Sequence, residues 1–226
     1  MLDTLPDMFL AVGALGTASF GLVDVSRAFF GGVSNHGFAR IATAVKKLYP
    51  PVHGPLGQAE VLETLRAAWF NGKPMADQIA QAKCLIKLRL DPAGAAALAA
   101  ATGLDAARLS ALAGKLDQGA ALDDADRATA ERFDEIIGAL LDGAYQHADQ
   151  AYRNAAKAWA VAVSLALSVG GGWLMPHEGA YLGSKIFLQA VVIGLLAAPL
   201  APVTKDLANA VGAFSRAVRP SPTPPG

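Results

Sequence analysis

Residues 123–175 decide the fold, and they run DDADRATAERFDEIIGALLDGAYQHADQAYRNAAKAWAVAVSLALSVGGGWLM. Over the first two thirds of this stretch, apolar side chains recur near the spacing of a helix and form one stripe. The members of that stripe are Phe133, Ile136, Ile137, Leu140, Leu141, Ala144, Tyr145, Ala148, Tyr152 and Ala156. Residues 158–175 then carry no charged side chain, and no proline separates the two parts. The sequence therefore predicts one long helix that leaves a cytoplasmic bundle and continues as a membrane span.

The apolar stripe of this helix needs a partner surface. We expect it to pack on the other helices of the cytoplasmic bundle, because a helix with one apolar face buries that face. A second interpretation is a coiled-coil seam between two copies of the chain.

Two further stretches are apolar enough to be membrane spans. The first runs from Met8 to Val23 and extends to Phe30, and the other covers residues 186–203. Each approaches the roughly 20 residues that cross about 30 Å of hydrocarbon. A cleaved signal peptide is the alternative for the first stretch, but such a peptide begins with basic residues, whereas Asp3 and Asp7 make this start acidic. We therefore predict an uncleaved first helix.

Lysine and arginine positions orient the predicted spans. Basic residues follow the first span, precede the second and follow the third, whereas the link 176–185 carries only Lys185. Positive charge is enriched on the cytoplasmic side of membrane proteins. The sequence thus predicts a protein of the bacterial inner membrane, with its N-terminus outside and its C-terminus in the cytoplasm.

Together these patterns predict an all-α integral membrane protein with three transmembrane helices and a cytoplasmic helical bundle. The expected parts are an N-terminal transmembrane helix (1–32), a cytoplasmic helical domain (33–157), a second transmembrane helix (158–175), an outer hairpin loop (176–185), a third transmembrane helix (186–205), a cytoplasmic helical extension (206–218) and a disordered proline-rich tail (219–226). No segment keeps the alternation of a half-buried strand, so no sheet is expected.

Turn signals divide the cytoplasmic domain into several helices. Ser34 and Asn35 can cap the first of them. Gly72 stands where a glycine would end the second helix, and Pro74 opens the third. The single cysteine, Cys84, falls in an apolar-periodic run and is predicted to be a buried structural thiol.

Composition argues against several classes of function. Lys+Arg and Asp+Glu both number 19, and the resulting zero net charge disfavours a general nucleic-acid binder. One cysteine excludes an intramolecular disulfide. The 4 histidines stand singly, without the spacing of metal ligands, and no serine has a base partner in a hydrolase motif. No metal site and no cofactor are predicted, and an enzyme ranks behind the other function classes.

Two pairs of polar residues stand in or beside the predicted spans. Asp24 and Arg27 lie in the first span, three residues apart, where they can form an ion pair on one helix face. An ion or proton pathway is the alternative role for such intramembrane charges. Asp206 and Asn209 follow the third span on one helix face. We expect a structural role for this second pair, with a ligand site as the alternative.

The two ends of the chain resemble an uncharacterised bacterial inner-membrane protein family. The resemblance rests on the opening from Leu2-Asp3 through Lys47, on Phe133-Asp134 through Arg153, and on the closing element Ala-Pro-x-x-x-Asp-Leu-x-Asn, which is Ala201–Asn209 here. The chain departs from the family at residues 168–170 and 203–205. The resemblance implies a membrane topology and a bacterial origin, and it implies no activity.

The function hypotheses follow from topology, because no motif indicates a reaction. The first is a membrane-anchored scaffold or accessory protein whose cytoplasmic bundle meets a protein partner. The alternative is an oligomeric channel, transporter component or membrane-perturbing effector, built on the small-residue face of Gly13, Thr17 and Gly21. The expected partners are the lipid bilayer and either another protein or further copies of this chain.

Overall fold

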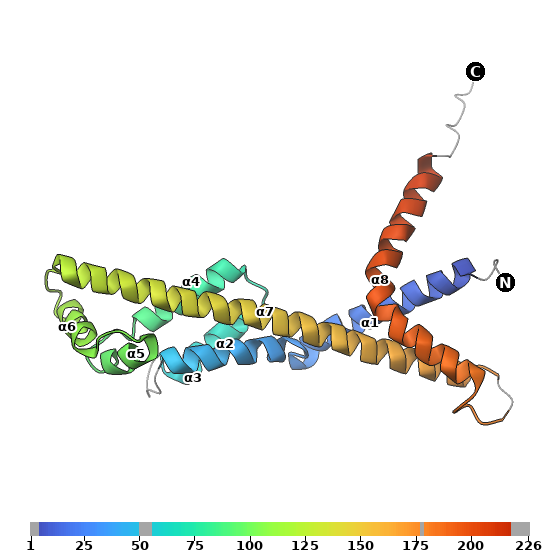
Figure 1. Cartoon of the computed structure of the whole chain (residues 1–226), viewed down its shortest axis with the longest axis horizontal. Coiled ribbons are helices and arrows are strands. Elements are labelled where there is room, and N and C mark those ends of the chain that lie inside the picture. Colours follow the sequence, from blue (N-terminus) through green and yellow to red (C-terminus); the bar gives the residue numbers. More distant parts are fainter. Residues whose placement is uncertain (1–4, 50–55, 177–178, 218–226) are drawn as a thin grey trace, which may run out of the picture. The chain divides into compact units, whose positions relative to one another are not determined.

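The computed structural model describes residues 5–49, 56–176 and 179–217, and it describes side chains for residues 11–26, 31–49, 56–176 and 179–201. These residues form helices and contain no strand, as predicted from the sequence (Figure 1). The chain divides into two compact units. One unit is Gly31–Asn154, called the bundle unit below. The other, called the apolar unit, combines the chain before Gly31 with the chain after Asn154.

The bundle unit holds five short helices and the first part of a long one. In chain order they are α2 (Ser34–Leu48), α3 (Gln58–Phe70), α4 (Met75–Lys87), α5 (Ala95–Thr102), α6 (Ala106–Asp117) and α7 (Asp124–Leu174). The sequence thus predicted correctly that a single helix runs from the bundle through the charge-free stretch, because nothing in residues 124–174 interrupts the helical hydrogen bonds.

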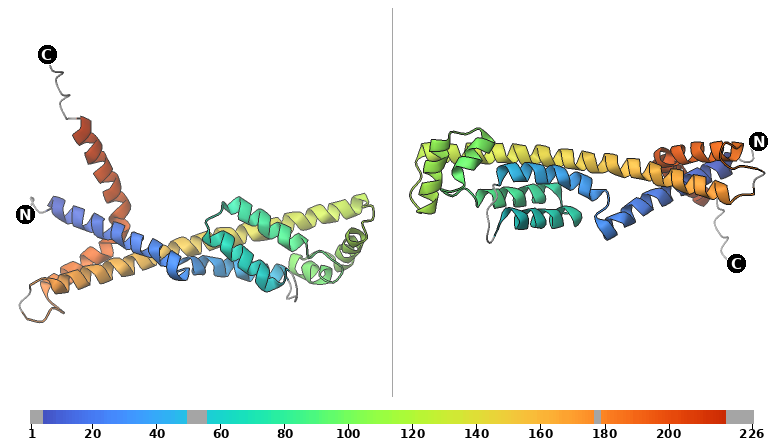
Figure 2. Two further views of the ribbon diagram at one scale, coloured as in Figure 1. Left: turned by 180° about the vertical axis from the view of Figure 1, so that it is seen from behind. Right: turned by 90° about the horizontal axis from the view of Figure 1, so that it is seen from below.

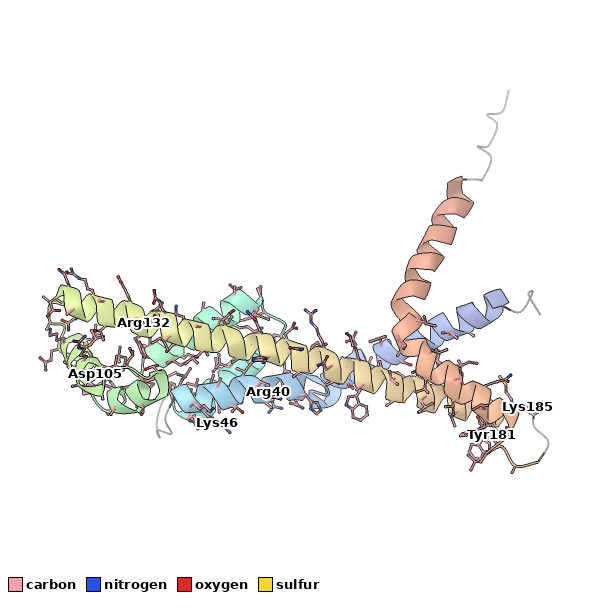
Figure 3. All side chains as sticks on the ribbon, in the orientation of Figure 1. Arg40, Lys46, Asp105, Arg132, Tyr181 and Lys185 are labelled. Atoms are coloured by element: carbon pink, nitrogen blue, oxygen red, sulfur yellow. The ribbon has the colours of Figure 1, made fainter. Side chains whose placement is uncertain are left out.

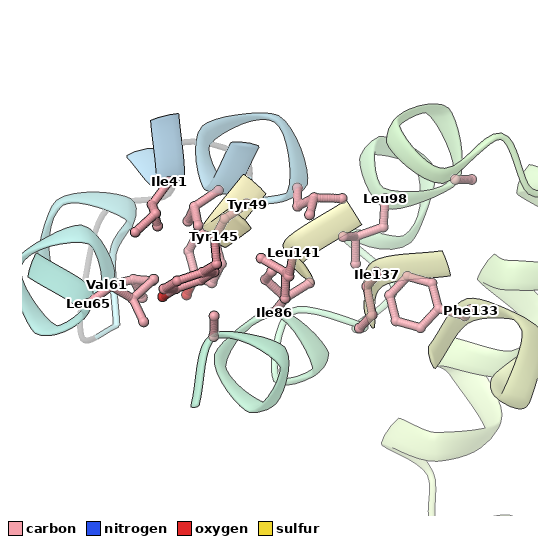
Figure 4. Packing of buried hydrophobic residues seen from close by; sticks show 14 of the residues in the cluster. Ile41, Tyr49, Val61, Leu65, Ile86, Leu98, Phe133, Ile137, Leu141 and Tyr145 are labelled. Carbon is pink, nitrogen blue, oxygen red and sulfur yellow. The ribbon is translucent and has the colours of Figure 1, made fainter. Parts of the chain in front are cut away.

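The predicted apolar stripe of α7 forms the core of the bundle unit. Phe133, Ile137, Leu141 and Tyr145 are between 0% and 2% exposed. Figure 4 shows them among buried side chains from the neighbouring helices, which include Ile41, Val61, Leu65, Ile86 and Leu98. The prediction that the stripe packs on other helices of the same bundle is therefore confirmed. Leu140 differs from its neighbours, because it is 44% exposed.

Ion pairs attach α7 to two of the short helices. Asp134 on α7 pairs with Lys83 of α4 at 2.5 Å and also with Lys87. The hydrogen bond from Lys83 and that from Lys87 hold the pKa of the Asp134 carboxyl below its usual range. At the start of α7, Asp126 accepts from Lys115 of α6 at 2.5 Å. These pairs join residues that are distant in sequence, so they help to fix α4 and α6 on α7.

Two local predictions were wrong. No side chain caps α2, because its N-cap residue is Val33, which has no polar side-chain atom, while Ser34 lies inside the helix and is buried. Asn35 instead accepts from Arg66 of α3 at 3.0 Å. Cys84 is exposed rather than buried. The buried side of α4 is Gln78, Ala82 and Ile86, and a residue two positions after Ala82 points about 200° away from that side.

The apolar unit contains α1 (Leu5–Phe30), the last part of α7 and α8 (Lys185–Ala217). α1 packs on α8, and the two helices cross in the left view of Figure 2. At their contact, a Cβ on Gly16 would collide with the Ala197 carbonyl oxygen, so the backbones meet directly. Two serines join α7 to α8. The Ser164 hydroxyl donates to the Gly194 carbonyl at 2.6 Å, and the Ser168 hydroxyl donates to the Ala190 carbonyl at 2.7 Å.

Among the described residues, one helix is long and apolar enough to cross a membrane, and this helix is α7. The described apolar parts of the other two candidates, Ala11–Ser26 in α1 and Lys185–Ala201 in α8, are shorter. The all-helical fold class is thus established. One helix, α7, supports an association with a membrane.

Candidate functional site

A groove on the surface of the bundle unit lies between α2 and α7. Its volume is about 770 Å³. Its floor consists of small or aliphatic side chains, namely Ala44, Leu48, Ala101, Ala139, Leu140, Gly143, Ala144 and Ala151. Its polar lining comes from Arg40, Thr43, Lys47, His147, Gln150 and Asn154.

The helical repeat of α2 produces one wall of the groove. Ile41, Val45 and Leu48 are buried against the core, so the polar positions between them face outward. Arg40 and Lys47 are seven residues apart and thus share one side of the helix, two turns from each other. Figure 3 labels Arg40 on this helix. This wall therefore carries two exposed cations that are aligned along the axis of α2.

Most of the floor comes from positions of α7 beside its fully buried residues Phe133, Ile137, Leu141 and Tyr145. Ala139, Gly143, Ala144 and Ala151 are small, so α7 leaves space where larger side chains would fill the gap to α2. A Cβ built on Gly143 meets no atom within 4 Å. The glycine is therefore not required by packing inside the bundle unit, and the floor of the groove is open above it.

Every charged residue that lines the groove is a cation or a histidine. The carboxylates of α7 nearest in sequence, Asp142 and Asp149, lie outside the lining and have other partners. Gln146 donates to Asp142 at 2.7 Å, and Arg153 pairs with Asp149 at 2.8 Å. Within the described part of the chain, no carboxylate forms an ion pair with Arg40 or Lys47. The groove is thus an electropositive surface with an apolar floor, which suits an anionic and partly apolar ligand.

The groove carries groups for binding. Arg40 and Lys47 donate hydrogen bonds, Gln150 and Asn154 can both donate and accept, and the Thr43 hydroxyl, which donates to the Ala39 carbonyl at 2.8 Å, can accept. Elsewhere in the described residues, no three His, Cys, Asp or Glu side chains come close enough to hold a metal ion. Of the histidines, His36 and His147 are described, and both are exposed.

The polar residues singled out from the sequence lie on α1 and α8, which belong to the apolar unit. Asp24 is exposed on α1. Arg27 lies on α1, and Asp206 and Asn209 lie on α8, but their side chains are outside the described residues. The Asp24–Arg27 ion pair and the structural role of Asp206 and Asn209 therefore stay predictions.

The predicted small-residue face of α1 is only partly used inside the chain. Gly13 is buried, and its carbonyl accepts from the Thr17 hydroxyl at 2.9 Å. Thr17 and Gly21 are exposed, and a Cβ on Gly21 meets nothing within 4 Å. The close approach to α8 is made instead by Gly16, which the sequence reasoning did not select.

Sequence reasoning also missed the groove. One part of it could have been predicted from the sequence. The spacing of Arg40, Thr43 and Lys47 places three polar side chains on one side of a helix. For the topology prediction, Arg40 and Lys47 count only among the basic residues that follow the first predicted span. The other part, the small residues at 139, 143, 144 and 151, becomes meaningful only when α2 is known to lie opposite them.

Comparison of the chain with protein-family models, with curated proteins and with solved structures finds no match. The resemblance to a bacterial inner-membrane family thus stays a prediction from the residues that carry it. Functional inference rests on the groove and on the apolar surface of α7.

Proposed function

We propose that this protein is a membrane-anchored scaffold or accessory protein that binds a protein partner in the groove between α2 and α7. Its three apolar helices hold it in the bacterial inner membrane, with the N-terminus outside and the bundle unit in the cytoplasm. The groove is the observation that carries the proposal, because it is the place in the described bundle unit where an open apolar floor and unpaired cations occur together.

The exposed surface of α7 supports the membrane anchor. Only 17% of its most apolar stretch is buried, whereas the core helix of a soluble protein would be mostly covered. Trp159 and Trp173 are 55% and 66% exposed, and they stand about 21 Å apart along the helix axis at 1.5 Å per residue. Tryptophan is enriched at both interfaces of a bilayer. α7 therefore has the surface of a span with an aromatic side chain near each end.

Helix pairing in the apolar unit supports the two remaining spans. α1 and α8 meet through Gly16 and Ala197, and Gly194 of α8 approaches Leu165 of α7 closely. Interhelical hydrogen bonds from Ser164 and Ser168 accompany these small residues. Small residues and serine hydroxyls at helix contacts are typical of membrane bundles, where lipid offers no hydrophobic drive for association. α1 and α8 thus complete a bundle around the membrane part of α7.

A capture experiment in cells tests the scaffold. The tagged full chain is crosslinked in membranes and its partners are quantified for the wild type, for Gly143→Phe and for Gly114→Phe. Both glycines lie in helices with no atom within 4 Å of a built Cβ, but only Gly143 lines the groove. The scaffold predicts a partner that Gly143→Phe loses and Gly114→Phe keeps. Equal partner sets in all three would overturn it.

Reporter fusions test the topology independently. Alkaline phosphatase should be inactive when it is fused at residue 100 and active when it is fused at residue 180, because this enzyme folds only outside the cytoplasm. Activity at residue 100 would place the groove outside and contradict the proposal.

An oligomeric channel or membrane-perturbing effector is the second candidate. The exposed Thr17 and Gly21 of α1 favour it, because a small-residue face that the chain itself leaves open lets another helix approach closely. Under this alternative, Gly21→Leu should dissociate an oligomer in nanodiscs. If the wild type is a monomer there, the channel reading fails.

A further inference from the structure

We propose that the partner element held in the groove is an acidic amphipathic helix, with two carboxylates seven residues apart and bulky aliphatic side chains between them. This inference rests on the proposed function and adds the chemistry of the ligand. It follows from the length of the groove, from the spacing of its cations and from the small size of its floor residues.

The length of the groove fits a helix of about four turns. Its lining on α7 runs from Ala139 to Asn154, which is about 22 Å along the helix axis at 1.5 Å per residue. The lining on α2 runs beside it from Arg40 to Leu48. A channel between two helices, with an apolar floor and polar edges, is the surface in which an amphipathic helix binds.

The distance between the two cations sets the spacing of the carboxylates on the partner helix. Arg40 and Lys47 lie on one side of α2 about 10.5 Å apart, which equals two turns of a helix. A second helix that follows α2 presents side chains at the same interval when its residues are seven apart. Thr43, between the two cations, donates to the Ala39 carbonyl and can accept a hydrogen bond from a polar group at the intermediate turn. Carboxylates at positions i and i+7 of the partner therefore meet Arg40 and Lys47 together.

The floor sets the size of the apolar side chains. Gly143, Ala144 and Ala151 provide almost no side-chain volume, and the space over Gly143 is empty to at least 4 Å. Close packing then requires the partner to fill the volume, because unfilled gaps forfeit dispersion contacts. Leucine or isoleucine at i+1 and i+4 points toward this floor when i and i+7 face α2, because at about 100° per residue these two positions lie on the same side of the line through i and i+7.

Charge complementarity selects this occupant over two others. A second copy of the chain that used the same groove in a symmetric dimer would bring Arg40 and Lys47 close to their own counterparts, since symmetric contacts repeat the same surface. An anionic bilayer is a flat surface and cannot reach a floor that lies between two helices. An acidic helix satisfies both the charge and the concave shape.

The test uses the full chain in phosphatidylcholine nanodiscs and a fluorescent helical peptide of about 18 residues, with glutamates at i and i+7 and leucines at i+1 and i+4. Fluorescence anisotropy should show saturable binding. The peptide with both glutamates changed to glutamine should bind about tenfold more weakly, and added salt should weaken only the glutamate peptide. Equal binding by both peptides would overturn the proposal.

A charge exchange makes the test specific. Lys47→Glu should weaken binding of the glutamate peptide about tenfold, and a peptide with lysine at i+7 should recover that loss. Lys46→Glu is the matched control: Lys46 is also exposed on α2 and carries the same charge, but it does not line the groove. Equal effects of the two variants would show that only net charge matters and would overturn the register.

The other occupants give distinct results. Wild-type dimers that Gly143→Phe converts to monomers, and that Gly114→Phe leaves intact, would identify a second copy. A dye attached at residue 143 that enters lipid in phosphatidylglycerol nanodiscs, but not in phosphatidylcholine nanodiscs, would identify the membrane surface. Either result overturns this inference. The two proposals can fail separately. If Gly143→Phe loses a partner protein that has no acidic helix, the scaffold function is supported and the acidic-helix inference is overturned. If the reporter fusions place the groove outside the cytoplasm, the scaffold function is overturned regardless of peptide binding.

Discussion

Two regions of this molecule are built from small residues, and they differ in whether anything fills the space. In the apolar unit, Gly16 and Gly194 are each covered by the backbone of a neighbouring helix. In the groove of the bundle unit, the space over Gly143 is open. Small residues in a helix therefore indicate close packing in one place and a vacant surface in the other. In each case a glycine stands inside a helix, and the position of the neighbouring helix separates the two cases.

The largest expected effect is at the filled contact. Gly16→Leu places a side chain against the Ala197 carbonyl and the Ala201 Cβ. Overpacking of this kind should cost about 3 kcal/mol and loosen α1 from α8. Thermal unfolding of the full chain in detergent measures it. Gly21→Leu, on the same helix with open space around it, should change the stability by less than about 0.5 kcal/mol. Similar losses in both would contradict the α1–α8 contact.

The buried side of α7 in the bundle unit should show a pH effect. Tyr145 is fully buried, no described residue bonds to its hydroxyl, and burial raises its pKa to about 12. The folded state therefore holds the phenol proton more tightly than the unfolded chain, in which the pKa is about 10. The resulting stability is complete below pH 10 and is lost as the pH rises from 10 to 12.

Tyr145→Phe isolates this effect. The variant should be more stable than the wild type by about 1 kcal/mol at pH 8, because an unpartnered buried hydroxyl is removed. Its advantage should grow by about 2 kcal/mol between pH 9 and pH 12. Denaturant unfolding at the three pH values measures the difference. A constant difference would mean that the hydroxyl is accessible to solvent or partnered.

The serine contacts should have a smaller effect. Ser164→Ala removes the hydrogen bond to the Gly194 carbonyl that joins α7 to α8, and should cost about 1 kcal/mol. Thr43→Ala in the groove removes only a bond to the Ala39 carbonyl within its own helix. That second change should leave the stability within about 0.5 kcal/mol of the wild type. The same unfolding assay compares the two variants. Equal losses of stability would contradict the difference between the covered contacts of the apolar unit and the open groove.

The smallest effect should have the opposite sign. Gly143→Ala adds a methyl group where no atom lies within 4 Å, and it replaces a poor helix former inside α7. The chain should become more stable by about 0.5–1 kcal/mol. Thermal unfolding checks the sign. A loss of stability would show that some part of the chain occupies the groove.

Much of the fold could be predicted from the sequence, because a helix is determined by residues that are close to one another in the sequence. The continuity of α7 follows from a 3.6-residue apolar period that changes, without a proline, into a charge-free run. The end of α3 before Gly72 and the start of α4 after Pro74 follow from the backbone preferences of glycine and proline. The burial of Cys84 was predicted wrongly, because the periodicity of a short helix leaves its phase uncertain by one or two residues.

The candidate site shows where local reasoning ends. The cations of α2 were visible in the sequence, but their position beside the small residues of α7 depends on contacts between segments about 100 residues apart. The same holds for Gly16, whose neighbour Ala197 is far along the chain. The sequence alone determined the helical class, the long helix and the apolar stretches, since these depend on hydrogen bonds and side-chain periods within a few residues. Tertiary structure decided which small residues are covered and which are open, because that depends on where another helix lies.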